Sequence, residues 1–208
     1  MEIKFFDEKT KKFYKLVPTK TWPTLEISGI NMHRIKDVDH KTDSELKLKV
    51  LGRIYGNVLD ICTGLGYTAI LAARRKSVKK VVTIEKDENV LKIARQNEFS
   101  KELFENPKIE IIVGDASEKI KKFENESFNF IIHDPPRISL APELYSFEFY
   151  SELSRVLKKG GKLFHYVGEP GKISGKNFIK GIVKRLLLAG FKKVVKVKEA
   201  KGIVAKKV

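Results

Sequence analysis

The sequence predicts an α/β fold with a doubly wound, mostly parallel seven-stranded sheet, a C-terminal antiparallel hairpin and a small N-terminal β-rich appendage. Three observations predict it. From Asn57 onward, short β-branched runs alternate with helical patterns, which is typical of a parallel sheet covered on both faces. A glycine turn at 63–66 joins the first of these runs to a helix. The last two runs are separated by only three residues and should pair as a hairpin.

The composition limits the class of protein. The 208 residues are enough for one full core, and the single cysteine, Cys62, excludes a disulfide framework. The N-terminus lacks the apolar region of a signal peptide, and no apolar run has membrane-spanning length. We therefore expect a cytoplasmic protein with no membrane partner and no bound metal.

The net charge of +16 is unevenly distributed. Residues 155–208 hold 16 Lys or Arg and two acids, so of the 42 basic and 26 acidic residues the first 154 positions hold 26 and 24. This asymmetry indicates a polyanionic partner, and we expect RNA. The alternative is a thermophile-like composition whose lysines only solvate the surface.

We divide the chain into an N-terminal β-rich extension, residues 1–41, and an α/β domain, residues 42–208. Alternating apolar residues and turn-like breaks indicate short strands in the extension. The run Thr42-Asp43-Ser44-Glu45 predicts a capping box at the start of the first helix. That helix should lead into the first core strand.

The core elements follow in a regular order. We expect strands over 58–61, 80–85, 108–113, 128–133 and 162–167, with Asp87 capping the helix after the second strand. Pro142 should lie in the first turn of a helix that buries Phe147 and Tyr150 and ends at Lys158–Gly160. A helix over 177–189 then precedes the hairpin of 192–198 and 202–208.

The first chemical motif is D-x-x-x-G-x-G, formed by Asp60, Gly64 and Gly66. The glycines allow close backbone approach to a ligand and positive φ angles. A carboxylate at Asp60 repels pyrophosphate but suits an ammonium and a sulfonium. The motif resembles motif I of the class I S-adenosylmethionine (SAM) methyltransferases. A dinucleotide site, or an Asp60 that only orders the turn, are the alternatives.

Further acids end the next strands at Glu85, Asp115 and Asp134, where ligands of such sheets bind. The resemblance implies that Glu85 binds the ribose hydroxyls. It also implies that Asp115 binds the adenine amino group and that Ala116 offers its backbone N–H to the ring. The SAM-binding residues we expect are Asp60, Thr63, Gly64, Gly66, Glu85, Lys86, Asp115, Ala116 and Asp134.

The run His133-Asp134-Pro135-Pro136-Arg137 resembles the [D/N]-P-P-[Y/F] motif of methyltransferases that act on amino nitrogens. An acidic side chain and a proline carbonyl that accept hydrogen bonds from the amine direct its lone pair at the sulfonium methyl. We therefore assign catalysis to Asp134, Pro135, Pro136 and Arg137.

Arg137 departs from the motif, which usually has an aromatic residue there. A guanidinium can stack on a base, or it can bind a phosphate or carboxylate. This difference leaves the identity of the substrate open, but it does not affect the expected cofactor. The residues we expect to bind substrate or RNA are Arg137, Tyr145, His165, Lys172 and Lys176.

Three further runs, M-H-R-I-K-D at 32–37, A-P-E-L-Y-S at 141–146 and G-G-K-L-F-H-Y-V-G-E-P-G at 160–171, resemble a family of predicted archaeal class I methyltransferases. Related sequences are labelled spermidine-synthase-like. This resemblance implies that His33 and Arg34 reach over the cofactor cleft. The alternative is that both residues only lie at the surface.

Our first hypothesis is a SAM-dependent N-methyltransferase that acts on an amino nitrogen of a tRNA or rRNA base. Base C5-methylation is excluded because the only thiol, Cys62, lies beside the cofactor turn. The second hypothesis is methylation of a protein side chain or small molecule. The third is aminopropyl transfer from decarboxylated SAM. Asp134 could deprotonate the acceptor amine in this reaction, but Arg137 disfavours it because a cationic acceptor needs an acidic pocket. A non-catalytic module that binds SAM or RNA is the fourth.

Overall fold

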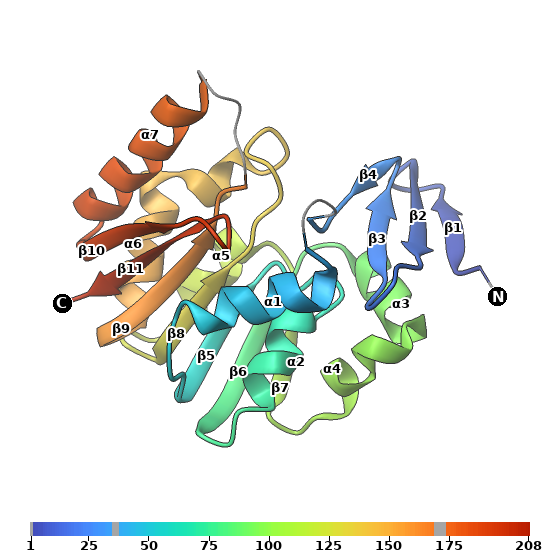
Figure 1. Cartoon of the computed structure of the whole chain (residues 1–208), viewed down its shortest axis with the longest axis horizontal. Helices are drawn as coiled ribbons and strands as arrows, with labels where there is room; N and C mark the ends of the chain where they lie inside the picture. The colour runs from blue at the N-terminus through green and yellow to red at the C-terminus, as the bar shows by residue number, and fades with distance from the viewer. Residues whose placement is uncertain (1, 35–37, 169–173) are drawn as a thin grey trace.

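A computed structural model describes residues 2–34, 38–168 and 174–208, and it leaves the side chains of 174–176 undescribed. The main sheet has seven strands in the order β10-β11-β9-β8-β5-β6-β7, and a separate four-stranded sheet lies beside it (Figure 1). The predicted fold class is confirmed. The boundary between residues 41 and 42 stays a prediction.

Parallel pairing joins five strands of the main sheet, and β10 and β11 add an antiparallel hairpin at one edge. The strands pack with Val, Ile and Leu on both faces, which is why they read as continuous apolar runs. Their bounds are Gly56–Ile61 (β5), Val78–Glu85 (β6), Ile109–Val113 (β7), Phe128–His133 (β8), Leu157–Tyr166 (β9), Phe191–Val197 (β10) and Gly202–Lys207 (β11).

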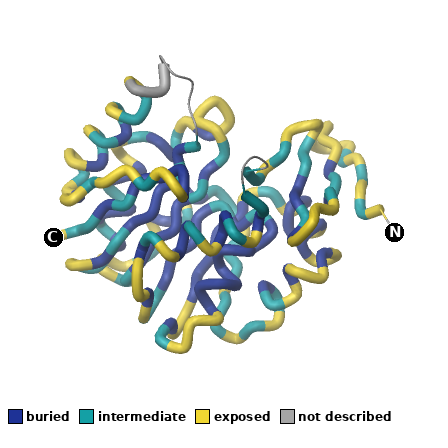
Figure 2. The backbone as a smooth tube through the Cα atoms, in the orientation of Figure 1, coloured by how far each residue is buried: buried dark blue, intermediate teal, exposed yellow. Residues whose placement is uncertain are grey.

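Helices cover both faces of this sheet, so the core divides into two clusters of buried side chains. One cluster packs under α1 to α4 and the other under α5 to α7, and the central strands between them are the most buried part of the sheet (Figure 2). The helices are His40–Lys49 (α1), Tyr67–Ala73 (α2), Glu88–Gln96 (α3), Lys101–Glu105 (α4), Ala116–Lys119 (α5), Phe147–Val156 (α6) and Ser174–Leu188 (α7), with 3₁₀ turns at Glu98–Ser100, Ile120–Lys122 and Pro142–Tyr145. Among the helices of the described ranges, none is both long and apolar enough to cross a membrane.

The N-terminal sheet is antiparallel and packs against the main domain. Its strands are Lys4–Asp7 (β1), Lys12–Val17 (β2), Thr24–Ile27 (β3) and Ile30–Asn31 (β4). The Tyr14 hydroxyl donates a 2.7 Å hydrogen bond to Asp87, the residue that caps α3 as predicted. The Trp22 ring lies 4.7 Å from the Tyr67 ring, at the start of α2. These contacts fix the sheet beside the glycine turn.

The predicted capping box is wrong. Asp39 caps α1, and its carboxylate accepts a hydrogen bond from the Thr42 backbone N–H at 3.1 Å. The helix therefore begins before Thr42, and Asp43 falls within its first turns, where its side chain is buried.

The predicted helix from Pro142 to Lys158 is also wrong. A 3₁₀ turn ends at Tyr145, and Ser146, in extended conformation, starts α6 by accepting a hydrogen bond from the Phe149 backbone N–H. Strand β9 follows directly, so Gly160 lies within a strand. Tyr150 is buried as expected, whereas Phe147, at the first position of α6, is 42% exposed.

Candidate functional site

The strand ends β8, β5, β6 and β7 lie side by side at one edge of the sheet, and each supplies one of the acids expected there. Asp60 pairs in register with Thr83 of β6 and Ile132 of β8. The orientation of each carboxylate depends on its hydrogen bonds and ion pairs with neighbouring elements.

Asp60 lies beneath the turn and is completely buried. Its two oxygens accept hydrogen bonds from the Thr68 and Thr83 hydroxyls, each at 2.8 Å. Burial raises the pKa of Asp60 to about 7. Both oxygens therefore bind side chains beside the turn, as expected if Asp60 orders it, and binding of a ligand by Asp60 stays a prediction.

The turn itself is fixed from both sides. The Thr83 hydroxyl donates to Asp60, so the Thr63 hydroxyl donates to Thr83 across 2.6 Å. Gly64 and Gly66 both have positive φ, at 56° and 79°. A Cβ on Gly66 would lie 2.6 Å from the Leu103 side chain, whereas a Cβ on Gly64 would meet no atom within 4 Å. Gly64 therefore borders open space.

Glu85 faces this turn from the end of β6. Its carboxylate accepts hydrogen bonds from the backbone N–H groups of Gly64 and Asp87, both at 2.9 Å. Burial raises the pKa of Glu85. Each oxygen keeps a second lone pair, so the carboxylate is oriented and still able to accept hydroxyl donors. Binding of ribose by Glu85 stays a prediction.

Asp115 caps the short helix α5 by accepting a hydrogen bond from the Ser117 backbone N–H. Its other oxygen pairs with the Lys86 ammonium at 2.6 Å. Although partial burial acts in the opposite direction, the Lys86 and Ser117 hydrogen bonds lower the pKa of Asp115. Ala116 is buried at the first position of α5. The roles of these residues in ligand binding stay predictions.

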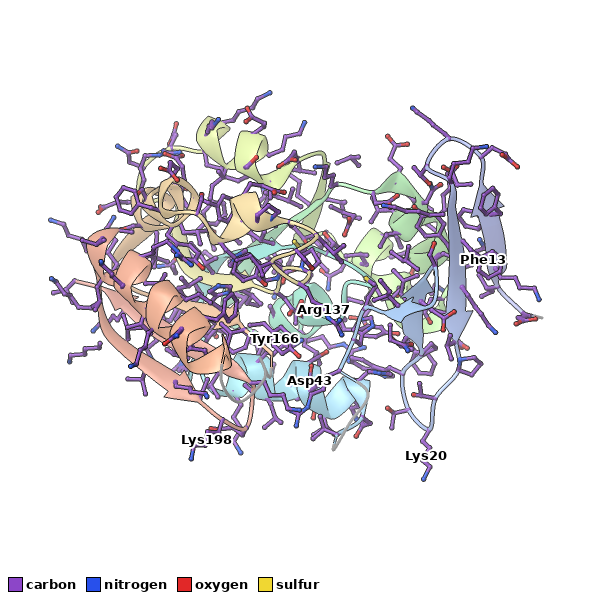
Figure 3. All side chains as sticks on the ribbon, turned by 90° about the horizontal axis from the view of Figure 1, so that it is seen from above. Phe13, Lys20, Asp43, Arg137, Tyr166 and Lys198 are labelled. Atoms are coloured by element: carbon purple, nitrogen blue, oxygen red, sulfur yellow. The ribbon has the colours of Figure 1, made fainter. Side chains whose placement is uncertain are left out.

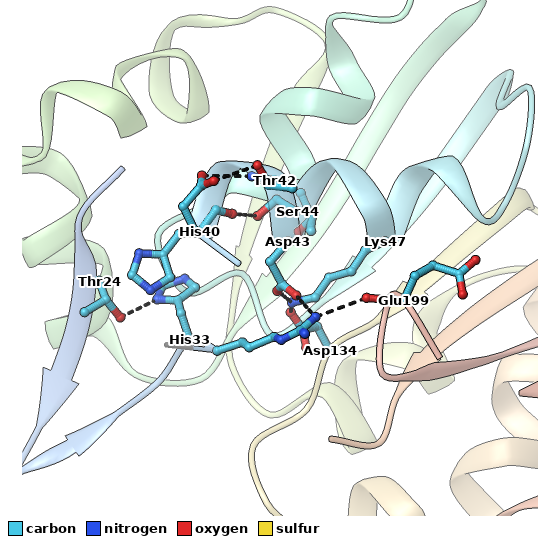
Figure 4. Close-up of polar contacts among 12 residues, drawn as sticks. Thr24, His33, His40, Thr42, Asp43, Ser44, Lys47, Asp134 and Glu199 are labelled. Carbon is cyan, nitrogen blue, oxygen red and sulfur yellow. Dashed lines mark hydrogen bonds and ion pairs between the residues drawn. The ribbon is translucent and has the colours of Figure 1, made fainter. Parts of the chain in front are cut away.

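Asp134 follows β8 and is held by a residue that the sequence analysis missed. The Lys47 Nζ lies 2.7 Å from Asp134 Oδ2 and 2.9 Å from Asp43 Oδ2 (Figure 4). The same nitrogen sits 4.8 Å from the centre of the Tyr166 ring. Burial disfavours the ammonium, but the two carboxylates raise the pKa of Lys47 above its ordinary value. Asp134 keeps 23% of its side chain exposed.

Arg34 extends this network to the C-terminal hairpin. Its guanidinium lies 3.5 Å from Asp43 and donates to the Glu199 carbonyl (Figure 4). His33 instead bonds the Thr24 hydroxyl through Nδ1 at 2.9 Å, and burial lowers its pKa to about 3. Arg34 thus lies beside the acids near Asp134, and His33 has a neutral, structural position. The spacing of Asp43 and Lys47 on α1 was the available sequence signal.

Two residues expected to contact substrate are corrected by their burial. Tyr145 is 4% exposed, and its hydroxyl donates to the Pro136 carbonyl at 2.7 Å. His165 is fully buried, with Nε2 2.9 Å from the Tyr150 hydroxyl. Neither ring offers an open stacking face. Tyr145 instead fixes the loop that follows Asp134.

Arg137 is exposed at the start of a turn in which its carbonyl accepts a hydrogen bond from the Leu140 backbone N–H. Lys172 and the side chain of Lys176 lie outside the described residues, so their proposed contacts stay predictions. A nucleic-acid partner for the basic third also stays a prediction. An apolar hollow of about 450 Å³ lies on α7, away from the strand ends, and has no acid in its lining.

Comparison with known proteins gives a family match: residues 54–181 match the spermine/spermidine synthase domain. An uncharacterized protein of Methanocaldococcus jannaschii is 54% identical over 197 residues, which are 94% of this chain and 67% of that protein. A polyamine aminopropyltransferase of Sulfolobus acidocaldarius is 34% identical over 119 residues, which are 55% of this chain and 39% of that protein.

A solved spermidine synthase in complex with a transition-state analogue, AdoDATO, has the same fold. It superposes with a TM-score of 0.80 at 21% identity, over 99% of this chain and 73% of that chain. The spermidine synthase of Thermotoga maritima gives a TM-score of 0.76 at 22% identity. The superposition covers 100% of this chain and 72% of that chain. The class I methyltransferase-like fold is confirmed.

These matches overturn the first hypothesis. RNA methylation, and SAM as its methyl donor, are wrong, because the matching family and the Sulfolobus relative are polyamine-forming proteins by name. The motif around Asp134 misled us because aminopropyl and methyl transfer need the same element, an acid beside an amine nucleophile. The resemblance to a predicted archaeal methyltransferase family with a D-P-P-R motif, here residues 134–137, is not shown.

Proposed function

Since the chain belongs to the spermine/spermidine synthase family, we propose that it is an enzyme that transfers an aminopropyl group from decarboxylated SAM to an amine nitrogen. The matched segment spans only 39% of the Sulfolobus relative, so the proposal rests on residues that this chain itself contains. The observation that carries it is Asp134, held at the end of β8 by Lys47 and still partly exposed.

The chemistry requires an amine lone pair directed at the donor carbon bonded to sulfur. A C–N bond forms at that carbon and the C–S bond breaks. The sulfur keeps the electron pair and leaves as neutral methylthioadenosine. The proton lost from the nitrogen passes to the Asp134 carboxylate. Asp134 therefore has two tasks, to orient the amine and to accept its proton.

Lys47 prepares Asp134 for the first task. Its buried ammonium binds Oδ2 and fixes the plane of the carboxylate. We assign the acceptor amine to the other oxygen, Oδ1. Since Lys47 contacts Asp134 and not the reacting atoms, we regard it as a positioning residue.

The neighbouring strand ends suit the adenosyl part of the donor. Gly64 borders open space, so a ligand can approach its backbone closely. Glu85 is fixed by two backbone N–H groups and keeps lone pairs for the ribose hydroxyls. Asp115 lies one strand further along the same edge. The distribution of these acids supports a donor that spans β5 to β7 with its sulfur towards β8.

The test uses the purified chain, decarboxylated SAM labelled in the aminopropyl group, and a set of primary amines. We expect release of methylthioadenosine together with a labelled N-aminopropyl product, both measured by mass spectrometry. With SAM in place of the decarboxylated donor we expect neither. Methyl transfer from SAM, and no product from decarboxylated SAM with any amine, would overturn the proposal.

A matched pair of variants tests the role of Asp134. Asp134→Asn keeps the shape of the side chain but removes the proton acceptor, so kcat should fall by about 100-fold or more. Binding of decarboxylated SAM, measured by calorimetry, should change little. The control is Glu118→Gln, which breaks an exposed pair with Lys121 and should keep full activity.

A further inference from the structure

We propose that the acceptor amine carries an oxyanion, a carboxylate or a phosphate, and that Arg137 binds this group while Asp134 receives the amine. This inference rests on the proposed function, since it specifies the acceptor used at the same site. It differs from a polyamine acceptor, which carries positive charge along its whole length at neutral pH.

The first support is the charge balance around Asp134. Two carboxylates, Asp134 and Asp43, face two cations, Lys47 and Arg34. Lys47 binds both carboxylates at 2.7 and 2.9 Å, and Arg34 lies 3.5 Å from Asp43. The acids beside the acceptor position are therefore already matched by cations of the protein.

The second support is the burial of this network. The side chains of Lys47 and Asp43 are 4% and 2% exposed, and that of Arg34 is 9% exposed. Buried charges are screened only weakly by solvent, so this balanced set of charges offers no net attraction to a second ammonium. A polyamine loses hydration at each ammonium on binding and needs carboxylates without partners to replace it. Among the described residues of this network, Asp134 Oδ1, the oxygen assigned to the reacting amine, is the one carboxylate oxygen without a cation beside it, so none remains for a second ammonium.

The third support is Arg137 itself. In the part of the chain that the structure describes, no ion pair uses its guanidinium, and the residue is exposed. Seen from above, Arg137 projects close to Tyr166 and Asp43 (Figure 3). Arg137 lies three positions after Asp134, so the two backbones are at most about 10 Å apart. We place the acceptor between these two side chains, with its amine at Asp134 and its oxyanion at Arg137.

The backbone of Arg137 is held on both sides. The Tyr145 hydroxyl binds the carbonyl of Pro136, and the Arg137 carbonyl accepts the Leu140 N–H at 2.8 Å. Proline fixes φ at the two positions before it. A guanidinium on a fixed backbone presents its N–H donors in a planar fork that suits a carboxylate or phosphate.

The test compares three acceptors with decarboxylated SAM and follows methylthioadenosine release. 1,4-Diaminobutane and 4-aminobutyrate have the same four-carbon length and differ at one end, an ammonium against a carboxylate. 3-Aminopropyl phosphate is the acceptor that carries a phosphate in place of the carboxylate. We expect kcat/KM at least tenfold higher for one or both oxyanion-bearing acceptors than for the diamine. A diamine that reacts as well or better would overturn the inference and leave the proposed function intact.

Variants of Arg137 give an independent readout. Arg137→Gln should lower the ratio of kcat/KM for the preferred oxyanion acceptor over the diamine at least tenfold, mainly through KM. Arg137→Lys should restore part of that ratio, and Lys121→Gln, at an exposed pair, should leave it unchanged. An unchanged ratio in Arg137→Gln would overturn the role of Arg137. No methylthioadenosine release with any of the three acceptors would overturn the acceptor inference, and the proposed function would fall only if the wider set of primary amines also gave none.

Discussion

The Lys47 ammonium lies 2.7 Å from the Asp134 carboxylate, although 87 positions separate the two residues in the chain. This contact ties α1, which precedes the main sheet, to the end of β8, where we place the reaction. Asp43, on the same helix as Lys47, completes the pair from the other side at 2.9 Å. The helix before the sheet is therefore part of the site.

Lys47→Met should lower both activity and stability. The substitution keeps much of the side-chain volume but leaves Asp43 buried without its ammonium, and breaking such a pair costs about 3 kcal/mol or more. Asp134 also loses the group that orients it, so we expect kcat to fall about tenfold to 100-fold. Urea unfolding and methylthioadenosine release measure the two effects.

The control for Lys47→Met is Lys41→Met on the same helix. Lys41 pairs with Glu45 at 3.9 Å on an exposed face, and such pairs contribute about 0.5 kcal/mol or less. If both substitutions lowered activity equally, Lys47 would have no specific role beside Asp134.

Tyr145→Phe should weaken acceptor binding while leaving the fold in place. The hydroxyl donates to the Pro136 carbonyl, so its loss leaves that carbonyl without this partner and should destabilise the protein by about 1 kcal/mol. The loop then holds Arg137 less firmly, and KM for the acceptor should rise several-fold. Steady-state kinetics measures KM, with Tyr55→Phe, an exposed tyrosine, as the matched control. The same KM in both variants would contradict this role.

Gly66→Ala should destabilise the turn more than Gly64→Ala. Both positions have positive φ, which costs a residue with a Cβ about 1 kcal/mol. Only at Gly66 would the new Cβ also meet the Leu103 side chain, at 2.6 Å. We expect thermal unfolding to show the larger loss for Gly66→Ala. Calorimetry should instead show the larger loss of donor affinity for Gly64→Ala, since that Cβ projects into open space. The reverse order in both assays would refute the assignment.

The sequence predicted the main sheet well because each core strand is a short apolar run that ends at an acid or a glycine. It did not predict how those acids are used. Asp60, assigned to the ligand, is bound by Thr68 and Thr83, which lie on two other elements. Their hydroxyls become its partners only once the sheet forms.

Contacts between elements distant in the chain account for the other errors. The pair of Lys47 and Asp134 joins two such elements, and the spacing of Asp43 and Lys47 on α1 indicates an ion pair but not its contact with Asp134. Tyr145 and His165 read as possible stacking residues because they lie close in sequence to the loops at the strand ends, but α6 and α7 pack over them. The sequence shows that both residues lie near these loops. Their burial becomes visible only in the folded structure.

Acid should destabilise the protein through a buried histidine pair. His133 and His165 are both fully buried, with ring centres 4.5 Å apart. Burial lowers the pKa of His133 to about 3, and it lowers the pKa of His165 as well. Between about pH 6.5 and 3 the unfolded chain therefore binds protons that the folded chain does not. The stabilisation is complete above pH 6.5 and is lost as the pH falls through this range.

His133→Gln isolates one of these groups, since it removes the titrating ring and keeps an N–H donor for the Leu144 carbonyl. Each such histidine contributes up to about 1.4 kcal/mol per pH unit to the slope of unfolding free energy against pH. Asp60, with its pKa raised to about 7, contributes in the opposite direction between pH 4 and 7, but equally in both proteins. Urea unfolding from pH 6.5 to 4.5 should therefore show a shallower loss of stability in the variant. Equal slopes in the two proteins would mean that His133 already binds a proton in the fold.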